Sequence, residues 1–385
     1  MAVKESNIKS GKTTESLLAK VLQDKLRPRL KDTVSRLFQG DFSSFPFAAL
    51  VDLTPSCNLD CPWCIDRFAR LGKEIPTEKM LDLLDEFKEM GILSVVYFGG
   101  GEPLMHSGIE KILLKTNCLG IDYAINTNGI FLDRALSIIG ETCSWTRISW
   151  DAGSREAYRD IHQGKDFFDR ILKNTGELMK VAQGTVGISF VIMKDNISEI
   201  VKATRVAKNI GCDFIQFKPE YTPLKSNKRI LSYYKDDLSA DIEQQLDLAQ
   251  AEETPNFSVL STGSLRTVLD KKPLNQSKNY CYCAAQQFIP LITPHGVYVC
   301  PNWRGAKSKC VGDILNTTFK SVWNGEKRQN IIRRLNPAKE CEVNCLRHNI
   351  NILVNSLIEA KKMNLDLLEY LKEIPGEKIS DRYFI

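Results

Sequence analysis

The chain has 385 residues, of which 43% are hydrophobic and 26% are charged, with a formal net charge of +5. This composition is ordinary for a globular protein with a large core, and the modest positive charge does not indicate a nucleic-acid partner. No stretch approaches the ~18 apolar residues of a membrane span, and the polar N-terminal segment lacks the apolar core of a signal peptide. We therefore expect a cytoplasmic protein that binds neither a membrane nor nucleic acid.

Short apolar runs alternate with amphipathic helical segments along the first half of the chain. The first helix is expected where Leu17, Leu18, Val21 and Leu22 recur at helical spacing. The predicted strands are 47–53, 94–98, 121–126, 146–151, 187–193 and 213–218. The helices between them are predicted at 77–91, 131–139, 167–181 and 197–210, with one more after strand 94–98 that ends at about residue 117. Six such units indicate a parallel sheet covered by helices, and they are too few for a closed eight-stranded barrel.

These changes of pattern divide the chain into five predicted parts. They are a tail with a helix (1–45), a partial barrel (46–221), a charged connecting region (222–275), a cysteine-rich segment (276–349) and a C-terminal helix (350–385) that breaks at Pro375–Gly376. Twelve cysteines are many for a chain expected to stay in a reducing compartment. Metal binding or catalysis is therefore the first explanation to consider for them.

Three cysteines follow the first predicted strand in the segment CNLDCPWC. Cys57, Cys61 and Cys64 have the spacing C-x3-C-x2-C. Three thiolates on one loop can hold three irons of a cubane cluster and leave the fourth iron open. An open position is typical of a catalytic metal site, whereas a structural zinc ion needs a closed set of four ligands. The loop also follows the carboxyl end of a strand, where barrel enzymes carry their catalytic groups.

This segment resembles the motif of the radical S-adenosylmethionine (SAM) superfamily, in which an aromatic residue, here Trp63, precedes the last cysteine. The resemblance implies that the three cysteines hold a [4Fe–4S] cluster whose open iron binds the amino and carboxylate groups of SAM. It further implies that an electron from the cluster cleaves SAM to a 5′-deoxyadenosyl radical, which removes hydrogen from a substrate. A flavodoxin- or ferredoxin-type protein is the implied reductant.

Four further segments resemble the superfamily in the expected order, over roughly residues 47–220. The strands end in YFGGGEPLMH (97–106), NTNG (126–129) and ISWDAG (148–153), and the fifth is followed by MKDN (193–196). The resemblance implies that the GGGEP turn contacts the amino group of SAM, and that Ser149 and Asp151 face the cofactor. His162, in IHQG, stands where the superfamily often has an arginine. The implied SAM-binding residues are Trp63, Gly99, Gly100, Gly101, Glu102, Pro103, Asn126, Thr127, Asn128, Ser149 and Asp151.

The C-terminal part carries six more cysteines, at 281, 283, 300, 310, 341 and 345. Their order, with the hairpin HGVYVCPN, the segment VGDI and a closing pair, resembles the SPASM/twitch extension of the superfamily. The resemblance implies one auxiliary [4Fe–4S] cluster, which needs four thiolates. The chosen ligands are Cys283, Cys300, Cys341 and Cys345, with Cys281 competing for the place of Cys283, His348 in reserve, and zinc as the alternative metal. Cys118, Cys143 and Cys212 occur singly on apolar elements and are predicted to be buried.

The fold class is thus predicted as α/β, a partial (β/α)6 TIM-like barrel with a small C-terminal β-hairpin/helix iron–sulfur (twitch) domain. Lys218, Glu220 and Tyr97 are candidate catalytic residues, because they stand at strand ends that face a barrel mouth. The main expectation is oxidation or rearrangement of a small metabolite, sugar- or aminocyclitol-like, since only about 45 residues precede the first strand. The alternatives are a maturase of ribosomally made peptides and a non-catalytic iron–sulfur or zinc scaffold.

Overall fold

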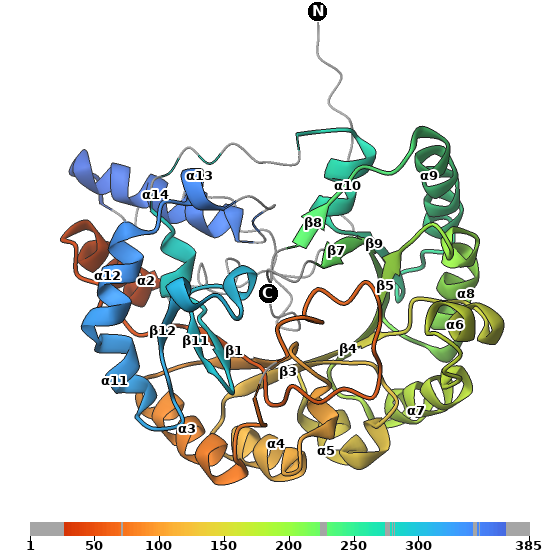
Figure 1. Ribbon diagram of the computed structural model, residues 1–385, viewed down its shortest axis with the longest axis horizontal. Coiled ribbons are helices and arrows are strands. Elements are labelled where there is room, and N and C mark those ends of the chain that lie inside the picture. The colour runs from red at the N-terminus through yellow and green to blue at the C-terminus, as the bar shows by residue number, and fades with distance from the viewer. Residues whose placement is uncertain are drawn as a thin grey trace, which may run out of the picture.

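The computed structural model describes residues 27–70, 72–223, 229–273, 278, 280, 282–341, 345 and 347–366. Its centre is one curved sheet with helices along the outer side (Figure 1). The strand order is β12-β11-β10-β1-β2-β3-β4-β5-β6-β9. The predicted helix at Leu17–Leu22 and the predicted break at Pro375–Gly376 lie outside the described residues.

All neighbours from β10 to β9 in this order run parallel, and β10, β11 and β12 pair antiparallel. The strands have the following bounds: β1 (Ala48–Val51), β2 (Ser94–Tyr97), β3 (Asp122–Thr127), β4 (Trp145–Ser149), β5 (Thr185–Ile192), β6 (Phe214–Pro219), β9 (Ser258–Ser261), β10 (Leu291–Thr293), β11 (Gly296–Tyr298) and β12 (Cys310–Gly312). A separate antiparallel pair is formed by β7 (Tyr221–Pro223) and β8 (Arg229–Leu231).

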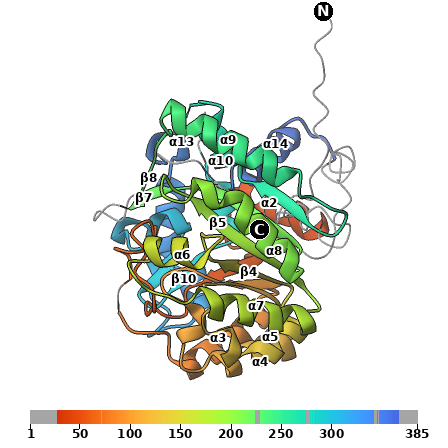
Figure 2. The same cartoon turned by 90° about the vertical axis from the view of Figure 1, so that its right-hand side faces the viewer.

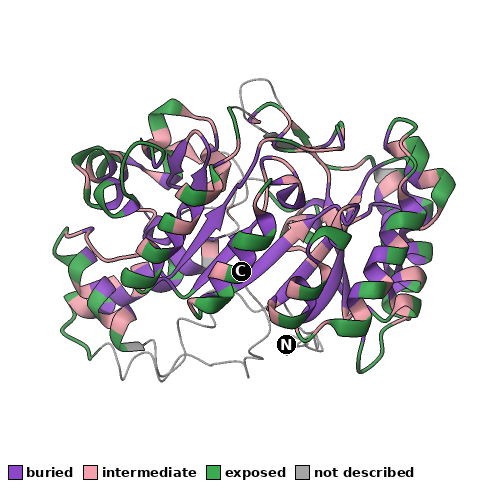
Figure 3. Cartoon of the chain, turned by 90° about the horizontal axis from the view of Figure 1, so that it is seen from below, coloured by how far each residue is buried: buried purple, intermediate pink, exposed green. Residues whose placement is uncertain are grey.

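Helices that follow the parallel strands cover the outer side of the sheet (Figures 1 and 2). They are α3 (Thr77–Glu89), α4 (Ile109–Cys118), α5 (Leu136–Thr142), α6 (Arg155–Ile161), α7 (Phe168–Val181), α8 (Ile200–Ile210), α9 (Asp236–Gln250) and α10 (Gly263–Leu269). Each longer helix buries one apolar stripe; in α3 it consists of Met80, Leu83, Leu84 and Phe87. Figure 3 shows the same division, with buried strands and helices that expose their outer faces.

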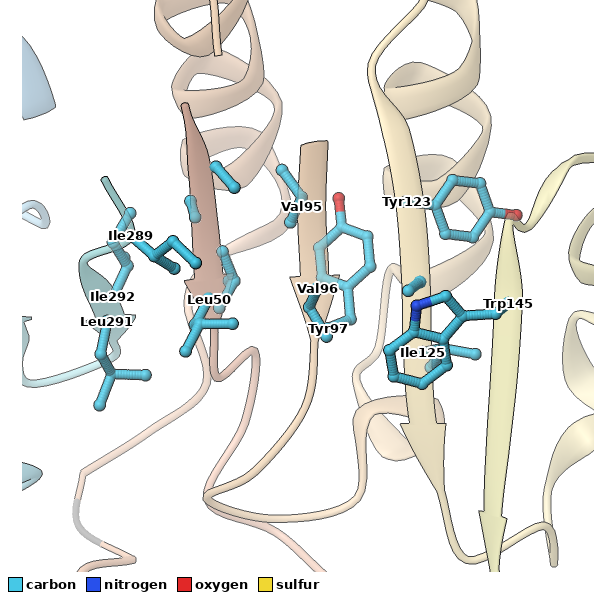
Figure 4. Packing of buried hydrophobic residues seen from close by; sticks show 14 of the residues in the cluster. Leu50, Val95, Val96, Tyr97, Tyr123, Ile125, Trp145, Ile289, Leu291 and Ile292 are labelled. Carbon is cyan, nitrogen blue, oxygen red and sulfur yellow. The ribbon is translucent and has the colours of Figure 1, made fainter. Parts of the chain in front are cut away.

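The predicted fold class is confirmed, and the sheet is longer than the six predicted strands. At one edge β9 pairs in parallel with β6, although residues 222–275 were expected to be only an irregular connection with one or two helices. At the other edge β10 pairs in parallel with β1, which carries the first cysteine loop. The hairpin of the cysteine-rich segment therefore continues the barrel sheet. Figure 4 shows side chains of these neighbouring strands, among them Leu291, Leu50 and Val96, lying side by side in the sheet.

The remaining helices gather beside β10 to β12 (Figure 1). They are α2 (Arg27–Phe38), α11 (Phe319–Asn324), α12 (Glu326–Arg334), α13 (Pro337–Glu340) and α14 (His348–Lys362). Helix α14 lies against α2, where the Lys361 ammonium donates to Ser35 Oγ at 3.1 Å. In the described part of the chain, no helix combines the length and the apolar character that a membrane crossing requires.

Candidate active site and second cysteine cavity

The loop that follows β1 brings Cys57, Cys61 and Cys64 together at the carboxyl end of the sheet. All three side chains are half-buried. Burial raises the pKa of Cys57 and Cys61, and the neighbouring thiols raise it further. The positive charge of Arg70, whose Nη2 donates to Cys64 Sγ at 3.0 Å, lowers both of these pKa values in part. Cysteine ligands without their metal are expected to resist ionisation in this way, because the metal cation stabilises the thiolate form.

Polar atoms without a partner surround this loop. Within the described residues, Asn58 Nδ2, Arg70 Nε and Tyr158 Oη are buried and make no hydrogen bond. The Tyr158 ring is fully buried and interacts electrostatically with Cys61 and Asp151. Buried donors normally have partners, so three unsatisfied ones around one loop indicate that an acceptor belongs there. The sulfur atoms of an iron–sulfur cluster are suitable acceptors, and the residues present therefore fit a cluster.

The glycine turn after β2 lies directly on the cysteine loop. Gly101 N donates to Thr54 O and Glu102 N donates to Ser56 O, both at 2.8 Å. A Cβ atom on Gly101 would lie 2.0 Å from Ser56 O, so only glycine allows this approach. Gly99 and Gly100 reach the turn with φ of +68° and +64°, a region that favours glycine. The glycines thus dock two loops that both face the predicted cofactor.

Glu102 holds the same turn to the end of β3. Its carboxylate accepts from Thr127 Oγ1 at 2.6 Å, from Asn128 N at 2.7 Å and from Leu104 N at 3.1 Å. Burial raises the pKa of Glu102 to about 7, although the three donors act in the opposite direction. The resemblance placed this carboxylate beside the amino group of SAM. In the structure both of its oxygens accept hydrogen bonds from protein donors and fix the turn, and its contact with SAM remains a prediction.

Glu102→Gln is expected to lower the free energy of unfolding by about 1–3 kcal/mol, because the new NH2 group must face a donor that the carboxylate now accepts. Urea unfolding measures this loss. The matched control is Glu177→Gln, whose parent residue pairs with Lys180 on the surface, and we expect a change below about 0.5 kcal/mol there. Equal stability of the two variants would mean that Glu102 does not hold the turn.

Asp151, Trp63 and His162 form the opposite wall. Asp151 has φ of +52° and accepts from Val191 N at 2.7 Å, and the nearby Trp63 side chain favours the charged form of its carboxylate. Burial raises the pKa of Asp151 to about 6, and burial lowers the pKa of His162 to about 4. The His162 ring packs edge-on against Trp63 and stacks on Tyr158. Neutral His162 therefore supports the tryptophan and does not replace the cationic arginine often found at this position.

A buried arginine joins the cysteine loop to the C-terminal part of the chain. Arg304 donates to both carboxylate oxygens of Asp52, from Nε to Oδ2 at 2.6 Å and from Nη2 to Oδ1 at 2.9 Å. Its Nη1 donates to Asp66. Asp52 follows β1, and Asp66 follows the last cysteine of the loop. All three side chains are almost completely buried. Sequence analysis missed this triad, since one partner is 252 positions from the other.

The three candidate catalytic residues at strand ends lie in different surroundings. Lys218 faces the barrel interior, as predicted, within electrostatic range of Asp151 and Arg147. Glu220 is half-buried at the rim near Asp195 and remains a prediction. Tyr97 does not project into the barrel mouth as expected, because its hydroxyl is buried against Thr116 of α4 at 2.6 Å, on the helix side of the sheet.

A second cavity, of about 420 Å³, lies beside β10 to β12. Its lining includes Cys283, Cys300, Cys341 and Cys345, the four cysteines chosen from the sequence. Arg347 also lines it, and the Nη2 atom of this buried arginine has no hydrogen-bond partner among the described residues. A cluster sulfur would satisfy that donor, so this set also fits an iron–sulfur cluster.

The remaining described cysteines and the reserve ligand His348 do not line this cavity. Cys281 lies outside the described residues, so its competition with Cys283 stays open. His348, the reserve ligand, bonds the Tyr280 hydroxyl through Nδ1 at 2.9 Å. Cys143 and Cys212 are buried as predicted, whereas Cys118, at the end of α4, is exposed and that prediction was wrong.

Residues 51–207 match the model of the Radical SAM superfamily, so this part of the chain is similar to a radical SAM domain. The cofactors of this family are SAM and a [4Fe–4S] cluster.

Mycofactocin maturase MftC of Mycolicibacterium smegmatis is 24% identical over 300 residues, which cover 77% of this chain and 74% of MftC. GTP 3′,8-cyclase of Chlorobaculum tepidum is 29% identical over 182 residues, 44% of this chain and about half (53%) of that protein. SuiB of Streptococcus suis has the same fold, with a TM-score of 0.62 and 19% identity over 81% of this chain and 73% of SuiB. SuiB bound to its precursor peptide SuiA aligns with a TM-score of 0.61 at 18% identity, over 94% of this chain and 79% of that chain.

Proposed function

We propose that this protein is a radical SAM maturase that oxidises a ribosomally made peptide and uses one auxiliary [4Fe–4S] cluster. The observation that carries the proposal is the cavity lined by four cysteines beside the radical SAM barrel. The peptide alternative is preferred over a small metabolite because MftC and SuiB are a maturase and a protein crystallised with a precursor peptide. A sugar- or aminocyclitol-like substrate has no support from these relatives.

Two groups of cysteines would hold the two clusters. Cys57, Cys61 and Cys64 would hold the cluster that binds SAM, and Cys283, Cys300, Cys341 and Cys345 would hold the auxiliary cluster. When bound, the first supplies one-electron cleavage of SAM to a 5′-deoxyadenosyl radical, and the second supplies an electron acceptor. In the described part of the chain, no three His, Cys, Asp or Glu side chains converge enough to hold a single ion. Thiols spread around a space fit the separate iron corners of a cubane better than one zinc ion.

The protein side chains would position and enclose these groups. Asp151, which lies near the loop residue Trp63, borders the cysteine loop on one side, and the glycine turn fixed by Glu102 borders it on the other. Arg70 Nη2 donates to Cys64 Sγ at 3.0 Å and would hold this side chain in place. Lys218 and Glu220 remain the candidates for proton transfer, because Lys218 lies near the carboxyl end of β6 and Glu220 directly follows that strand.

The proposal is tested with anaerobically reconstituted enzyme, SAM, dithionite and ribosomally made precursor peptides such as SuiA. We expect about eight irons per chain, since each cubane carries four, formation of 5′-deoxyadenosine, and a peptide that has lost hydrogen by mass spectrometry. If SAM were cleaved and a sugar or cyclitol were oxidised while no peptide was oxidised, the small-metabolite function would be favoured. Bound zinc without SAM cleavage would leave only the scaffold function.

Cys341→Ala combined with Cys345→Ala is expected to lower the iron content from about eight to about four per chain, because one cubane is lost. Dithionite-driven SAM cleavage should persist, and peptide oxidation should stop. Cys118→Ala, at an exposed position, is the matched control and should retain all iron. Unchanged iron content and unchanged peptide turnover in the double variant would contradict the auxiliary cluster.

A further inference from the structure

Two cationic side chains face the interior of the barrel without a carboxylate partner. Arg147 of β4 donates to Asn126 Oδ1 at 2.7 Å and to Gln216 Oε1 at 3.1 Å, and its guanidinium lies over the Trp145 ring. These acceptors are neutral. Lys218 makes no hydrogen bond or ion pair with any residue that the structure describes, and Arg147 makes no ion pair with one. Both are only partly accessible to water.

Strand register explains why the two cations meet. Arg147 pairs with Gly187 of β5, which has no side chain, so the guanidinium of β4 reaches across β5 to Gln216 of β6. Lys218 follows Gln216 on the same face of β6, two residues closer to the mouth. The ring of Phe214 occupies the space over Gly187 and closes the level below. Arg147 and Lys218 thus occupy successive levels under the mouth that holds Asp151.

Asp151 does not neutralise this pair. No ion pair joins Asp151 to Lys218, and the Asp151 carboxylate already accepts from Val191 N at 2.7 Å. Burial lowers the pKa of Lys218 well below its usual value and that of Arg147 to about 10, and the proximity of Arg147 lowers the pKa of Lys218 further. Like charges in a partly dry interior destabilise a protein unless an anion compensates for them.

We propose that Arg147 and Lys218 form a carboxylate-binding subsite inside the barrel, below the SAM-binding mouth. Arg147 offers a planar fork held in orientation by Asn126 and Gln216, which suits a carboxylate. Lys218 supplies a second charge nearer the mouth. The carboxylate belongs either to the methionyl part of SAM or to the substrate, and these two sources can be separated by experiment. The subsite does not depend on the substrate being a peptide.

The test compares Arg147→Gln and Lys218→Gln with Lys180→Gln, an exposed lysine on α7. With reconstituted enzyme, equilibrium dialysis measures SAM affinity, and thermal shift measures binding of succinate against its uncharged analogue succinamide. We expect Arg147→Gln and Lys218→Gln each to weaken the binding of SAM, of succinate or of both by tenfold or more. Weaker SAM binding identifies the methionyl carboxylate, and loss of succinate binding with SAM binding retained identifies the substrate.

A second readout separates binding from a structural role. Because Lys218 has no partner for its charge, Lys218→Gln should unfold at the same or a higher temperature than the parent enzyme when no ligand is present. A side chain that serves stability would instead lower that temperature. The proposal is overturned if both interior variants bind SAM and succinate within twofold of the parent, or if Lys218→Gln is destabilised without ligand. Failure to oxidise any peptide would leave these binding results unaffected.

Discussion

Arg304→Met is expected to lower the free energy of unfolding by about 3–5 kcal/mol, the usual cost of removing one partner from a buried ion pair. The change leaves Asp52 and Asp66 buried and facing one another without their shared cation. Asp52 is held near the end of β1, and Asp66 near the last cysteine of the loop, so the cysteine loop should loosen as well. Urea unfolding of anaerobically prepared enzyme measures the stability, and iron analysis measures the loop.

Two variants make the Arg304 prediction specific. Arg155→Met removes an exposed arginine that pairs with Asp166 and Asp169, and it should cost less than about 1 kcal/mol. Adding Asp52→Asn and Asp66→Asn to Arg304→Met removes the uncompensated charges and should recover part of the lost stability. If Arg304→Met were as stable as the surface variant, the triad would not be a structural link between the cysteine loop and the C-terminal part.

Gly101→Ala is expected to lower the free energy of unfolding by about 3 kcal/mol, at the upper end of the usual effect of overpacking. The loss is large because the added methyl group meets backbone atoms rather than a flexible side chain. Its Cβ would lie 2.0 Å from Ser56 O and 2.7 Å from the Pro55 carbonyl carbon. The two loops must separate, which breaks the bonds from Gly101 N to Thr54 O and from Glu102 N to Ser56 O. SAM affinity, measured by equilibrium dialysis, should fall at least tenfold.

Gly176→Ala is the matched control for Gly101→Ala. Gly176 lies within α7, and a Cβ there would meet nothing within 4 Å. Alanine in a helix interior is more stable than glycine by roughly 0.5–1 kcal/mol, so this variant should gain stability and bind SAM normally. Normal SAM affinity in Gly101→Ala would contradict the role assigned to the docking of the two loops.

Local patterns were sufficient for the barrel and for the first cysteine loop. Strand 94–98 was predicted from a continuous apolar run and is observed as Ser94–Tyr97. The cysteine spacing and the motifs at successive strand ends are local in sequence, and parallel strands bring their carboxyl ends to one edge. The four thiols of the second cavity were chosen from the order of motifs rather than from any period, and the structure brings them to one cavity.

Features that depend on distant parts of the chain were not predictable. The strands β9 and β10 are four and three residues long, too short to carry a periodic signal, and only their pairing with β6 and β1 defines them. The side chain of Tyr97 was assigned to the wrong face, because a fully apolar parallel strand has no alternation that distinguishes its faces. Arg147 could have been noticed as the charged residue in the apolar strand TRISWD.

The parallel pairing of β1 with β10 has a consequence for how the protein is made. Leu50 aligns with Leu291, so the first strand of the barrel leaves the ribosome more than half the chain earlier than its neighbour. At about 5–20 residues per second, one edge of β1 stays uncovered for on the order of ten seconds or more. Over that time the nascent barrel exposes an apolar strand edge and thiols that have no metal. Chaperone protection and late cluster insertion would suit such an order of synthesis, and truncation before β10 should produce chains that aggregate.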